Sequence, residues 1–401
     1  MTAIYIHIPF CKQRCRYCDF ITYANKENML PDYVDALQKE ILCSPYQVGN
    51  AQSLYFGGGT PSLLSVEQLG LILEAVDKRF GIADKAEITL EANPGAFDEG
   101  YFPHIRKLGV NRLSMGVQSL EDEELAILGR IHTADKAIQT YLAVREAGFD
   151  NVSLAMIFGL PGQSLKDWCW NLEKLVELNA EHFSVYSLIL EEGTELTRAI
   201  ERRDLSLPDD DLVADMYDMT IDTLDSLGYW HYEISSWAKD QAVESRHNKV
   251  YWRGEDYLGF GAAAVGCLNG LRWRNTDDIS DYVLKIRLNA HRERWANASM
   301  DEWKLMKGEV LGPAISEIER LDEDEQMKEM MLLGLRMTLE GVSEKAFYRR
   351  FGIDMVERFG KEIDELIAYG LVEWQDLFGG QHLVMTRRGV LLGNRVFSAF
   401  I

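Results

Sequence analysis

Short apolar runs alternate with longer segments of helical periodicity over about the first 230 residues of the chain. The predicted strands span residues 3–8, 53–56, 87–90, 111–116, 152–158 and 183–190. The predicted helices span residues 32–42, 66–80, 99–108, 134–147, 165–178 and 210–227. Parallel strands need a crossover connection, which is usually a helix. The alternation therefore predicts an α/β fold whose core is an open, partial (β/α)6 barrel.

The last third of the chain has a different pattern, in which short helices are followed by two strands. The predicted helices span 301–311, 321–335, 343–351 and 363–369, and the predicted strands span 370–374 and 383–386. This order predicts a winged-helix-like α+β domain. Beyond Arg387 and Arg388 the segment has no basic recognition helix, so we expect a lid or partner-docking role, not DNA binding. The expected domains are a barrel over 1–230, a connecting region over 231–315 and the winged-helix-like domain over 316–401.

Composition excludes several classes of protein. A chain of 401 residues with 47% hydrophobic content is long enough for one large and one or two smaller domains. No apolar run approaches the ~18 residues that span a bilayer, which excludes an integral membrane protein. The net charge of -22 opposes nucleic-acid binding, because neutralising phosphates needs clustered lysine and arginine. No secretory leader is apparent and cysteine is sparse, so we expect reduced thiols and a cytoplasmic location.

Three cysteines near the start of the chain carry the strongest chemical signal. Cys11, Cys15 and Cys18 have the spacing C-x3-C-x2-C, which can hold three irons of a 4Fe-4S cluster and leave the fourth iron open. A closed zinc site of these cysteines and His7 is the alternative. A disulfide fits less well, because six cysteines in the chain are not the density of a disulfide scaffold. The other three stand alone in sequence and are expected as small buried hydrophobes: Cys43, Cys169 and Cys267.

Unusual segments follow the predicted strands at their carboxyl ends, where parallel α/β barrels build their active sites. The cysteine loop follows the first strand, and the later segments are GGGTP at 57–61, EANPG at 91–95, GVQS at 116–119 and FGLPGQ at 158–163. The triple glycine lets backbone amides approach an anionic group, although a tight turn would also explain it. It is not a Walker phosphate loop, because no Lys-Ser or Lys-Thr follows. The clustering predicts one site at this edge of the sheet.

Three polar side chains near these segments are candidates for binding a ligand. Glu91 at a strand end can accept hydrogen bonds from an ammonium or ribose group, or it is a solvated acid in a turn. Gln118 and Arg130 can donate to a carboxylate or ribose, whereas a surface helix position is nearly as good an explanation of Arg130. A further pattern at 259–264 fits G-x-G-x-x-A, but no buried strand precedes it at 253–257. We interpret it as close backbone packing near the site.

The motifs occur in a fixed order that resembles a known family. They are CxxxCxxC with Tyr17 inside it, GGGTP, ExNPG, GVQS, GRIHT at 129–133 and GLPGQ at 159–163. Over the whole chain this order resembles the coproporphyrinogen dehydrogenase-like branch of radical S-adenosylmethionine (radical SAM) proteins. Within the branch the chain is similar to the HemW family of haem chaperones more than to the dehydrogenase HemN.

Three features favour the HemW family. The sequence starts ten residues before Cys11, without the amino-terminal extension of the dehydrogenase. Phe20 stands where the dehydrogenase has a further cysteine. Residues 247–252 match the HNxxYW motif that is typical of HemW proteins.

The resemblance implies that Cys11, Cys15 and Cys18 hold a 4Fe-4S cluster and that other matched positions contact S-adenosylmethionine. These positions are Tyr5, Tyr17, Gly58, Gly59, Thr60, Glu91, Gln118 and Arg130. Two departures predict an altered affinity or orientation of the cofactor. Ala155 stands where the family commonly has an aspartate. Residues 263–266 read AAVG where HemW-like chains often read GAHS, so Val265 weighs against a second cofactor site.

The HNxxYW segment has the residue types that bind a porphyrin. His247 can offer a nitrogen to haem iron, and Tyr251 and Trp252 offer flat aromatic faces. Three basic residues here form a local cluster suited to the two propionates: Arg246, Lys249 and Arg253. From the residues alone, His247 is as readily a hydrogen-bonded structural histidine and the basic residues a solvated loop edge. The resemblance favours haem ligation by His247.

Two functions from different classes follow. The first is a haem chaperone that binds haem, the cluster and S-adenosylmethionine, and delivers haem to a respiratory-chain protein by docking peripherally at the membrane. The second is an oxygen-independent coproporphyrinogen III dehydrogenase, in which S-adenosylmethionine is cleaved to a radical that starts an oxidative decarboxylation. Phe20 and the HNxxYW motif favour the first. A flavodoxin or ferredoxin would reduce the cluster. A radical SAM scaffold acting on an unrelated small molecule is a third hypothesis.

Overall fold

The structure is a computed structural model that describes residues 2–96, 100–289 and 312–401. The chain divides into two compact units. The first unit contains residues 1–156, 189–206 and 256–320, and the second contains residues 157–188, 207–255 and 321–401. The division predicted from sequence, at residues 230 and 315, remains a prediction.

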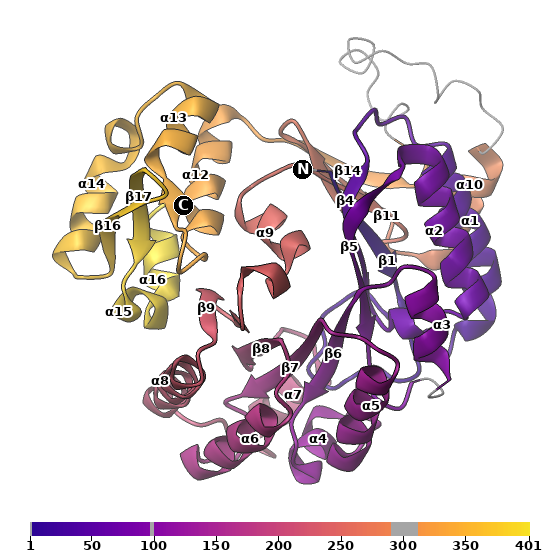
Figure 1. Ribbon diagram of the computed structural model, residues 1–401, viewed down its shortest axis with the longest axis horizontal. Helices are drawn as coiled ribbons and strands as arrows, with labels where there is room; N and C mark the ends of the chain where they lie inside the picture. Colours follow the sequence, from indigo (N-terminus) through magenta and orange to yellow (C-terminus); the bar gives the residue numbers. More distant parts are fainter. Residues whose placement is uncertain (1, 97–99, 290–311) are drawn as a thin grey trace. The chain divides into compact units, whose positions relative to one another are not determined.

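The first unit is built on a parallel sheet. Its strands follow one another in the order β1 (Ala3–Ile8), β4 (Ala51–Gly58), β5 (Ile82–Ala92), β6 (Arg112–Gln118) and β7 (Val152–Phe158). The connecting helices include α1 (Leu30–Leu42), α2 (Val66–Phe80), α3 (Tyr101–Lys107) and α5 (Ala134–Glu146). Figure 1 shows α1, α2 and α3 along one face of β1, β4 and β5. The predicted alternation of strands and helices is confirmed, and β1, α2 and β7 have the predicted bounds.

Local sequence explains where these elements begin and end. Ser65 caps α2 in a capping box with Gln68, and Gly81 ends the helix with a φ of 77° that favours glycine. All but one residue of β1 are buried, as expected for a strand covered on both faces. Burial of these apolar runs fixes the sheet that carries the candidate site.

The sheet of the first unit continues beyond β1 in a way that the sequence did not predict. β11 (Tyr257–Phe260) pairs parallel with β1, and β12 (Val265–Leu268), β13 (Leu271–Asn275) and β14 (Ile315–Arg320) follow as antiparallel strands. A Cβ on Gly259 would overlap the carbonyl oxygen of Val265, and one on Gly261 would lie 2.6 Å from the carbonyl oxygen of His7. The interpretation of the G-x-G-x-x-A pattern as close backbone packing is confirmed.

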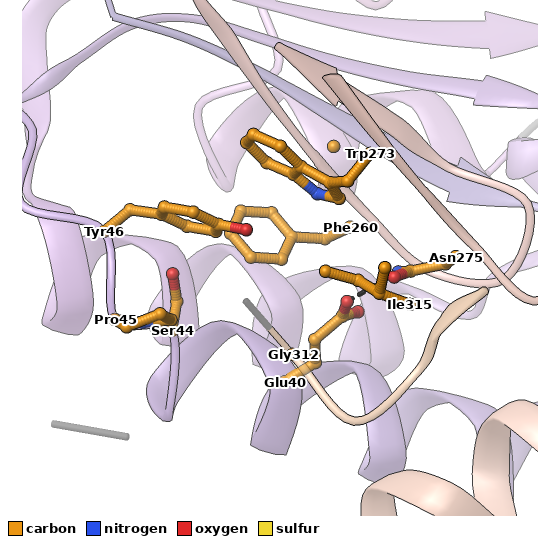
Figure 2. A pocket seen from close by; sticks show the side chains of 10 residues that line it. Glu40, Ser44, Pro45, Tyr46, Phe260, Trp273, Asn275, Gly312 and Ile315 are labelled. Atoms are coloured by element: carbon orange, nitrogen blue, oxygen red, sulfur yellow. Dashed lines mark hydrogen bonds between the residues drawn. The ribbon is translucent and has the colours of Figure 1, made fainter. Parts of the chain in front are cut away.

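A buried carboxylate ties α1 to this extension. Glu40 accepts hydrogen bonds from the hydroxyl of Tyr282 at 2.5 Å, the amide of Asn275 at 2.7 Å and the backbone N–H of Gly261 at 2.8 Å. Figure 2 shows the bond between Glu40 and Asn275. Burial raises the pKa of Glu40. The adjoining cavity has a volume of only about 10 Å³, which is room for about one water. We therefore assign this cluster a structural role.

The second unit contains a small antiparallel sheet of β8 (His182–Ser187), β10 (Ser236–Ala238) and β9 (Trp230–Glu233). Two long helices accompany it, α6 (Leu165–Glu177) and α8 (Asp210–Ser226). Trp168 of α6 is fully buried and donates to the hydroxyl of Thr220 of α8 at 3.0 Å. This pair fixes the two helices against each other.

The carboxyl-terminal part of the second unit has the predicted winged-helix-like order. It comprises α12 (Glu323–Gly334), β15 (Val342–Ser343), α13 (Glu344–Phe351), α14 (Met355–Ala368), β16 (Val372–Leu377) and β17 (Gly380–Met385). The strands form a sheet in the order β15-β17-β16. The helix predicted at 363–369 is the second half of α14. The helix predicted at 301–311 lies outside the described residues.

Two smaller findings concern the expectations from composition. Within the described residues, none of the helices has the length and apolar character needed to cross a membrane. The three lone cysteines are thiols and are half-buried, so the expectation that they are buried is wrong: Cys43, Cys169 and Cys267.

Candidate functional site

The cysteine loop lies directly after β1, and its backbone is held by several neighbouring segments. The N–H of Arg16 donates to the carbonyl of Leu128 at 3.0 Å, and the carbonyl of Arg16 accepts from the N–H of Leu196 at 2.8 Å. The side chain of Arg14 donates to the carbonyl of Cys18 at 3.1 and 3.2 Å. These bonds fix the loop that presents the three thiols.

A chain of side-chain hydrogen bonds links two of the three cysteines. The hydroxyl of Thr60 donates to Sγ of Cys11 at 3.6 Å and accepts from the amide of Asn93 at 2.9 Å. The amide oxygen of Asn93 accepts from Nη2 of Arg130 at 2.6 Å, and Nη1 of Arg130 lies 3.3 Å from Sγ of Cys15. Donors that point at sulfur suit thiolates, which are the metal-binding form of cysteine.

Cys11 is buried, Cys15 and Cys18 are half-buried, and the three thiols are close enough to influence one another. Burial raises the pKa of Cys11, and the neighbouring Cys18 and Cys15 add to this effect, whereas the bond from Thr60 opposes it. Burial also raises the pKa of Cys18. A metal centre bound here would displace the thiol protons, because cysteine ligates as thiolate.

The geometry does not support the zinc alternative. Nδ1 of His7 lies 3.0 Å from the hydroxyl of Tyr5, and Nε2 lies 3.3 Å from the carbonyl of Ile21, so both ring nitrogens are engaged. Burial lowers the pKa of His7 to about 4. Across the part of the chain that the structure describes, no three His, Cys, Asp or Glu side chains converge on a position for a single metal ion. A cubane cluster differs in that each of its cysteines binds a separate iron.

The triple glycine lies against the cysteine loop. The N–H of Gly58 donates to the carboxylate of Glu91 at 3.2 Å, and the hydroxyl of Tyr55 donates to the same carboxylate at 2.8 Å. Burial raises the pKa of Glu91, which these two bonds oppose. A Cβ on Gly59 would lie 3.0 Å from Sγ of Cys11 and 2.6 Å from the carbonyl oxygen of Phe10. Glycine is therefore required beside the cysteine, and Glu91 is no solvated turn residue.

The end of β6 is distorted where the GVQS segment begins. Gln118 is buried and has a φ of 71°, and the register with β7 shifts between Gly116 and Gln118. A non-glycine residue in this conformation costs free energy and is typical of functional sites. Arg130 donates to the carbonyl of Gly116 at 2.8 Å, which excludes the surface-helix explanation of this arginine. Ala155 pairs in register with Gly116, so the carboxylate that the family commonly has would lie at this edge.

Most of the predicted site residues belong to the first unit and lie in β1, in the cysteine loop, at the ends of β4, β5 and β6, or, for Arg130, in the loop after α4 (Asp122–Leu128). They are Tyr5, Cys11, Cys15, Tyr17, Cys18, Gly58, Gly59, Thr60, Glu91, Gln118 and Arg130. Tyr17 is half-buried. Sequence reasoning missed Asn93, which joins Thr60 to Arg130, although its place in the ExNPG motif was a usable signal. The GLPGQ segment at 159–163 belongs to the second unit, and its share in this site remains a prediction.

The HNxxYW segment forms the short helix α9 (Arg246–Trp252) in the second unit. His247 has 0% of its surface exposed, and its Nε2 lies 2.9 Å from the hydroxyl of Tyr251. The guanidinium of Arg336 lies 4.3 Å from the centroid of the Trp252 ring. His247 is thus placed as a hydrogen-bonded residue inside the unit, and any iron ligation through Nε2 requires the bond to Tyr251 to open.

Two of the three neighbouring basic residues, which were predicted to form a cluster suited to propionates, are engaged in ion pairs. Nζ of Lys249 lies 2.5 Å from both Glu244 and Glu340, and Nη2 of Arg253 lies 2.8 Å from Glu340. Burial opposes ionisation of Glu340, but the bonds from Lys249 and Arg253 hold its pKa below the usual range. The positive charges are already paired because Glu340, far along the sequence, packs against α9.

Comparisons with known proteins agree with this architecture. Residues 5–176 match the model of the radical SAM superfamily, and residues 321–392 match that of the HemN C-terminal domain. The protein named heme chaperone HemW of Bacillus subtilis is 34% identical over 100% of this chain and 99% of its own length. The chain belongs to the HemW family of radical SAM proteins.

Two further relatives extend this finding. A zebrafish protein named radical S-adenosyl methionine domain-containing protein 1, mitochondrial, is 34% identical over 97% of this chain and 82% of its own length. The solved structure of coproporphyrinogen III oxidase (HemN) from Escherichia coli has a TM-score of 0.79 and 22% identity, covering 100% of this chain and 89% of HemN. The HemW family and HemN therefore share the radical SAM fold with a C-terminal HemN domain, as the motif order predicts.

Proposed function

We propose that this chain is a haem chaperone that holds haem, a 4Fe-4S cluster and S-adenosylmethionine and delivers haem to a respiratory-chain protein. The observation that carries the proposal is the full-length similarity to proteins named heme chaperone HemW. Phe20 in place of a further cysteine and the HNxxYW segment at residues 247–252 add support from the chain itself.

The residues of the cysteine loop fit the cluster that the family implies. Cys11, Cys15 and Cys18 are reduced, and Thr60 and Arg130 direct donors at two of the sulfurs. When bound, the cluster would supply an electron and one iron open to the amino and carboxylate groups of S-adenosylmethionine. The polar groups around this loop have the chemistry to hold the rest of that cofactor: Tyr5, Tyr17, Gly58, Gly59, Thr60, Glu91, Gln118 and Arg130.

The chaperone works in the cytoplasm in this proposal, with a flavodoxin or ferredoxin as reductant. Hand-over of haem takes place by docking to an acceptor at the membrane surface, with no insertion of the chain. The winged-helix-like domain serves as a lid or docking element, not as a DNA reader, and the net charge of -22 supports this.

The second candidate is oxygen-independent coproporphyrinogen III dehydrogenase activity. The observation that favours it is the fold shared with HemN. Because HemN is only 22% identical to this chain, the similarity carries the fold and no reaction. The chaperone reading is therefore preferred.

One anaerobic experiment separates the two candidates. The chain is reconstituted with iron and sulfide, titrated with haem while the Soret band is recorded, and then incubated with coproporphyrinogen III, S-adenosylmethionine and a reductant. Stoichiometric haem binding without release of carbon dioxide supports the chaperone. Turnover of coproporphyrinogen III to a decarboxylated product overturns it in favour of the enzyme.

A further inference from the structure

A cavity of about 330 Å³ lies inside the second unit, where α9 meets the carboxyl-terminal domain. This volume falls in the range of pockets that accept small molecules. Its walls come from α9, from α12 and the segment that follows it, from α13 and from β17. The residues that decide its chemistry are Trp252, Met330, Met337, Ala346, Arg350 and His382.

His382 of β17 lines this cavity and has one ring nitrogen with a free lone pair. Its Nδ1 lies 2.7 Å from the carbonyl oxygen of Glu340. A carbonyl only accepts, so Nδ1 carries the proton and Nε2 of the neutral ring carries the lone pair. Nε2 has no hydrogen-bond partner among the residues that the structure describes. A histidine that binds a metal through one ring nitrogen usually donates the N–H of its other ring nitrogen to a carbonyl or carboxylate.

The other walls suit a flat apolar ligand with a soft metal centre. Trp252 contributes an aromatic surface, and Arg336, which does not line the cavity, covers part of its ring. Met330 and Met337 contribute thioethers, which are adaptable apolar groups and also ligands for haem iron. The cavity is also lined by Glu255 and by Arg253 and Glu340, which pair with each other, so Trp252 and the two methionines supply its apolar contacts.

One cation at the cavity is not committed to a carboxylate. Arg350 is exposed and donates to the carbonyl of Gly254 at 2.8 Å and to the side-chain oxygen of Gln326 at 3.4 Å. Within the described residues it forms no ion pair, unlike Arg253, whose charge Glu340 neutralises. A guanidinium in this state is available for a propionate of the ligand.

We propose that this cavity binds haem, with Nε2 of His382 as an axial ligand of the iron and Arg350 facing a propionate. The inference rests on the proposed function and names its haem site. His247 is then a positioning residue, because its bond to Tyr251 fixes the helix that carries Trp252 to the cavity wall. The HNxxYW motif and the carboxyl-terminal domain thus form one site.

The test is a titration of haem into the reconstituted full chain, read as difference spectra against the haem-free sample. His382→Ala is expected to weaken binding by at least about tenfold and to shift the Soret band, and added imidazole is expected to restore the wild-type spectrum. The matched control is His104→Ala. His104 is an exposed histidine of α3 whose Nδ1 makes the same kind of bond, 2.7 Å to the carbonyl of Gly100, and it lines no part of this cavity. Its substitution is expected to leave the titration unchanged.

A second variant keeps His382 and fills the cavity. Ala346→Trp adds an indole from an exposed position of α13 and is expected to lower haem affinity with little effect on folding. If the wild-type chain binds haem but both variants bind it with the same affinity and spectrum, this assignment is overturned and the chaperone proposal stands. If His247→Ala abolishes the iron-ligand spectrum while His382→Ala keeps it, the ligand is His247. Failure of the wild-type chain to bind haem contradicts the proposed function itself.

Discussion

Nη1 of Arg130 lies 3.3 Å from Sγ of Cys15, and the same guanidinium is fixed by Asn93 and by the carbonyl of Gly116. A charged N–H donor at a cluster cysteine stabilises the reduced, more negative state. We expect Arg130→Gln to lower the reduction potential of the reconstituted cluster by about 20–60 mV. This range is the net free energy of one hydrogen bond, expressed as a potential for a one-electron couple. Potentiometric titration followed by EPR measures this. An unchanged or raised potential would show that Arg130 does not act on the cluster.

Gly59 tests how tightly the triple glycine packs on the cysteine loop. Gly59→Ala introduces a Cβ that would meet the carbonyl oxygen of Phe10 and Sγ of Cys11, and backbone cannot yield cheaply. We expect lower iron incorporation and a loss of about 1–3 kcal/mol in the free energy of unfolding. Gly70→Ala is the control, because its Cβ would only touch Leu108 at 3.6 Å and alanine is the better helix former. Equal iron content in the two variants would contradict the packing argument.

Local patterns were sufficient for much of the parallel sheet. The bounds of β1, α2 and β7 follow from apolar periodicity and from caps such as Ser65, which act over a few residues. β11 and β14 were missed because their pairing joins segments far apart in sequence, as in the register of Tyr5 with Gly259. Tertiary pairing of this kind leaves little trace in a single sequence. β12 and β13 form a local hairpin through Asn269 and Gly270, whose Asn-Gly turn was a usable signal.

In the candidate site, too, local motifs were predicted and contacts between distant segments were not. Thr60 and Arg130 were predicted from motifs, whereas the role of Asn93 as the bridge between them follows from geometry, although it also lies in a motif. Lys249 was predicted in a basic cluster suited to propionates, but it pairs with Glu340, 91 residues away. His382 belongs to no motif, and its free nitrogen follows from a carbonyl 42 residues earlier. Charges and lone pairs are therefore the least predictable features of this chain.

His7 predicts a measurable pH dependence. Burial lowers its pKa to about 4 in the folded chain, against about 6.5 for an exposed histidine. Between these pH values the unfolded chain binds a proton that the folded chain does not. The free energy of unfolding therefore decreases by about 1.4 kcal/mol for each unit by which the pH is lowered. The contribution of His7 is fully present above pH 6.5 and is lost as the pH falls to about 4.

NMR titration of the ring protons of His7, assigned by comparison with His7→Gln, measures this pKa directly. The variant is expected to show a shallower decline of stability between pH 6.5 and pH 4. A ring that titrates near 6.5 would mean that His7 is not buried as described.

Lys249 anchors α9 to the carboxyl-terminal domain within the second unit. Only 8% of its side chain is exposed, and it lies between Glu244 and Glu340. Lys249→Met leaves the carboxylates without their buried cation, so we expect a loss of about 3–5 kcal/mol in the free energy of unfolding. The control Lys174→Met removes an exposed pair with Glu177 and is expected to cost less than about 1 kcal/mol. Urea unfolding monitored by tryptophan fluorescence measures both, and similar costs would refute a buried ion-pair cluster.

The most direct measurement for the whole account is the iron and acid-labile sulfide content of the anaerobically reconstituted chain. We expect roughly four irons and four sulfides per chain for the wild type and for Cys169→Ala, and a marked loss for Cys15→Ala. Cys169 is a lone, half-buried cysteine of α6 and therefore controls for the loss of a thiol. A wild-type chain that holds neither iron nor sulfide after reconstitution, or that retains one zinc ion, would contradict the account.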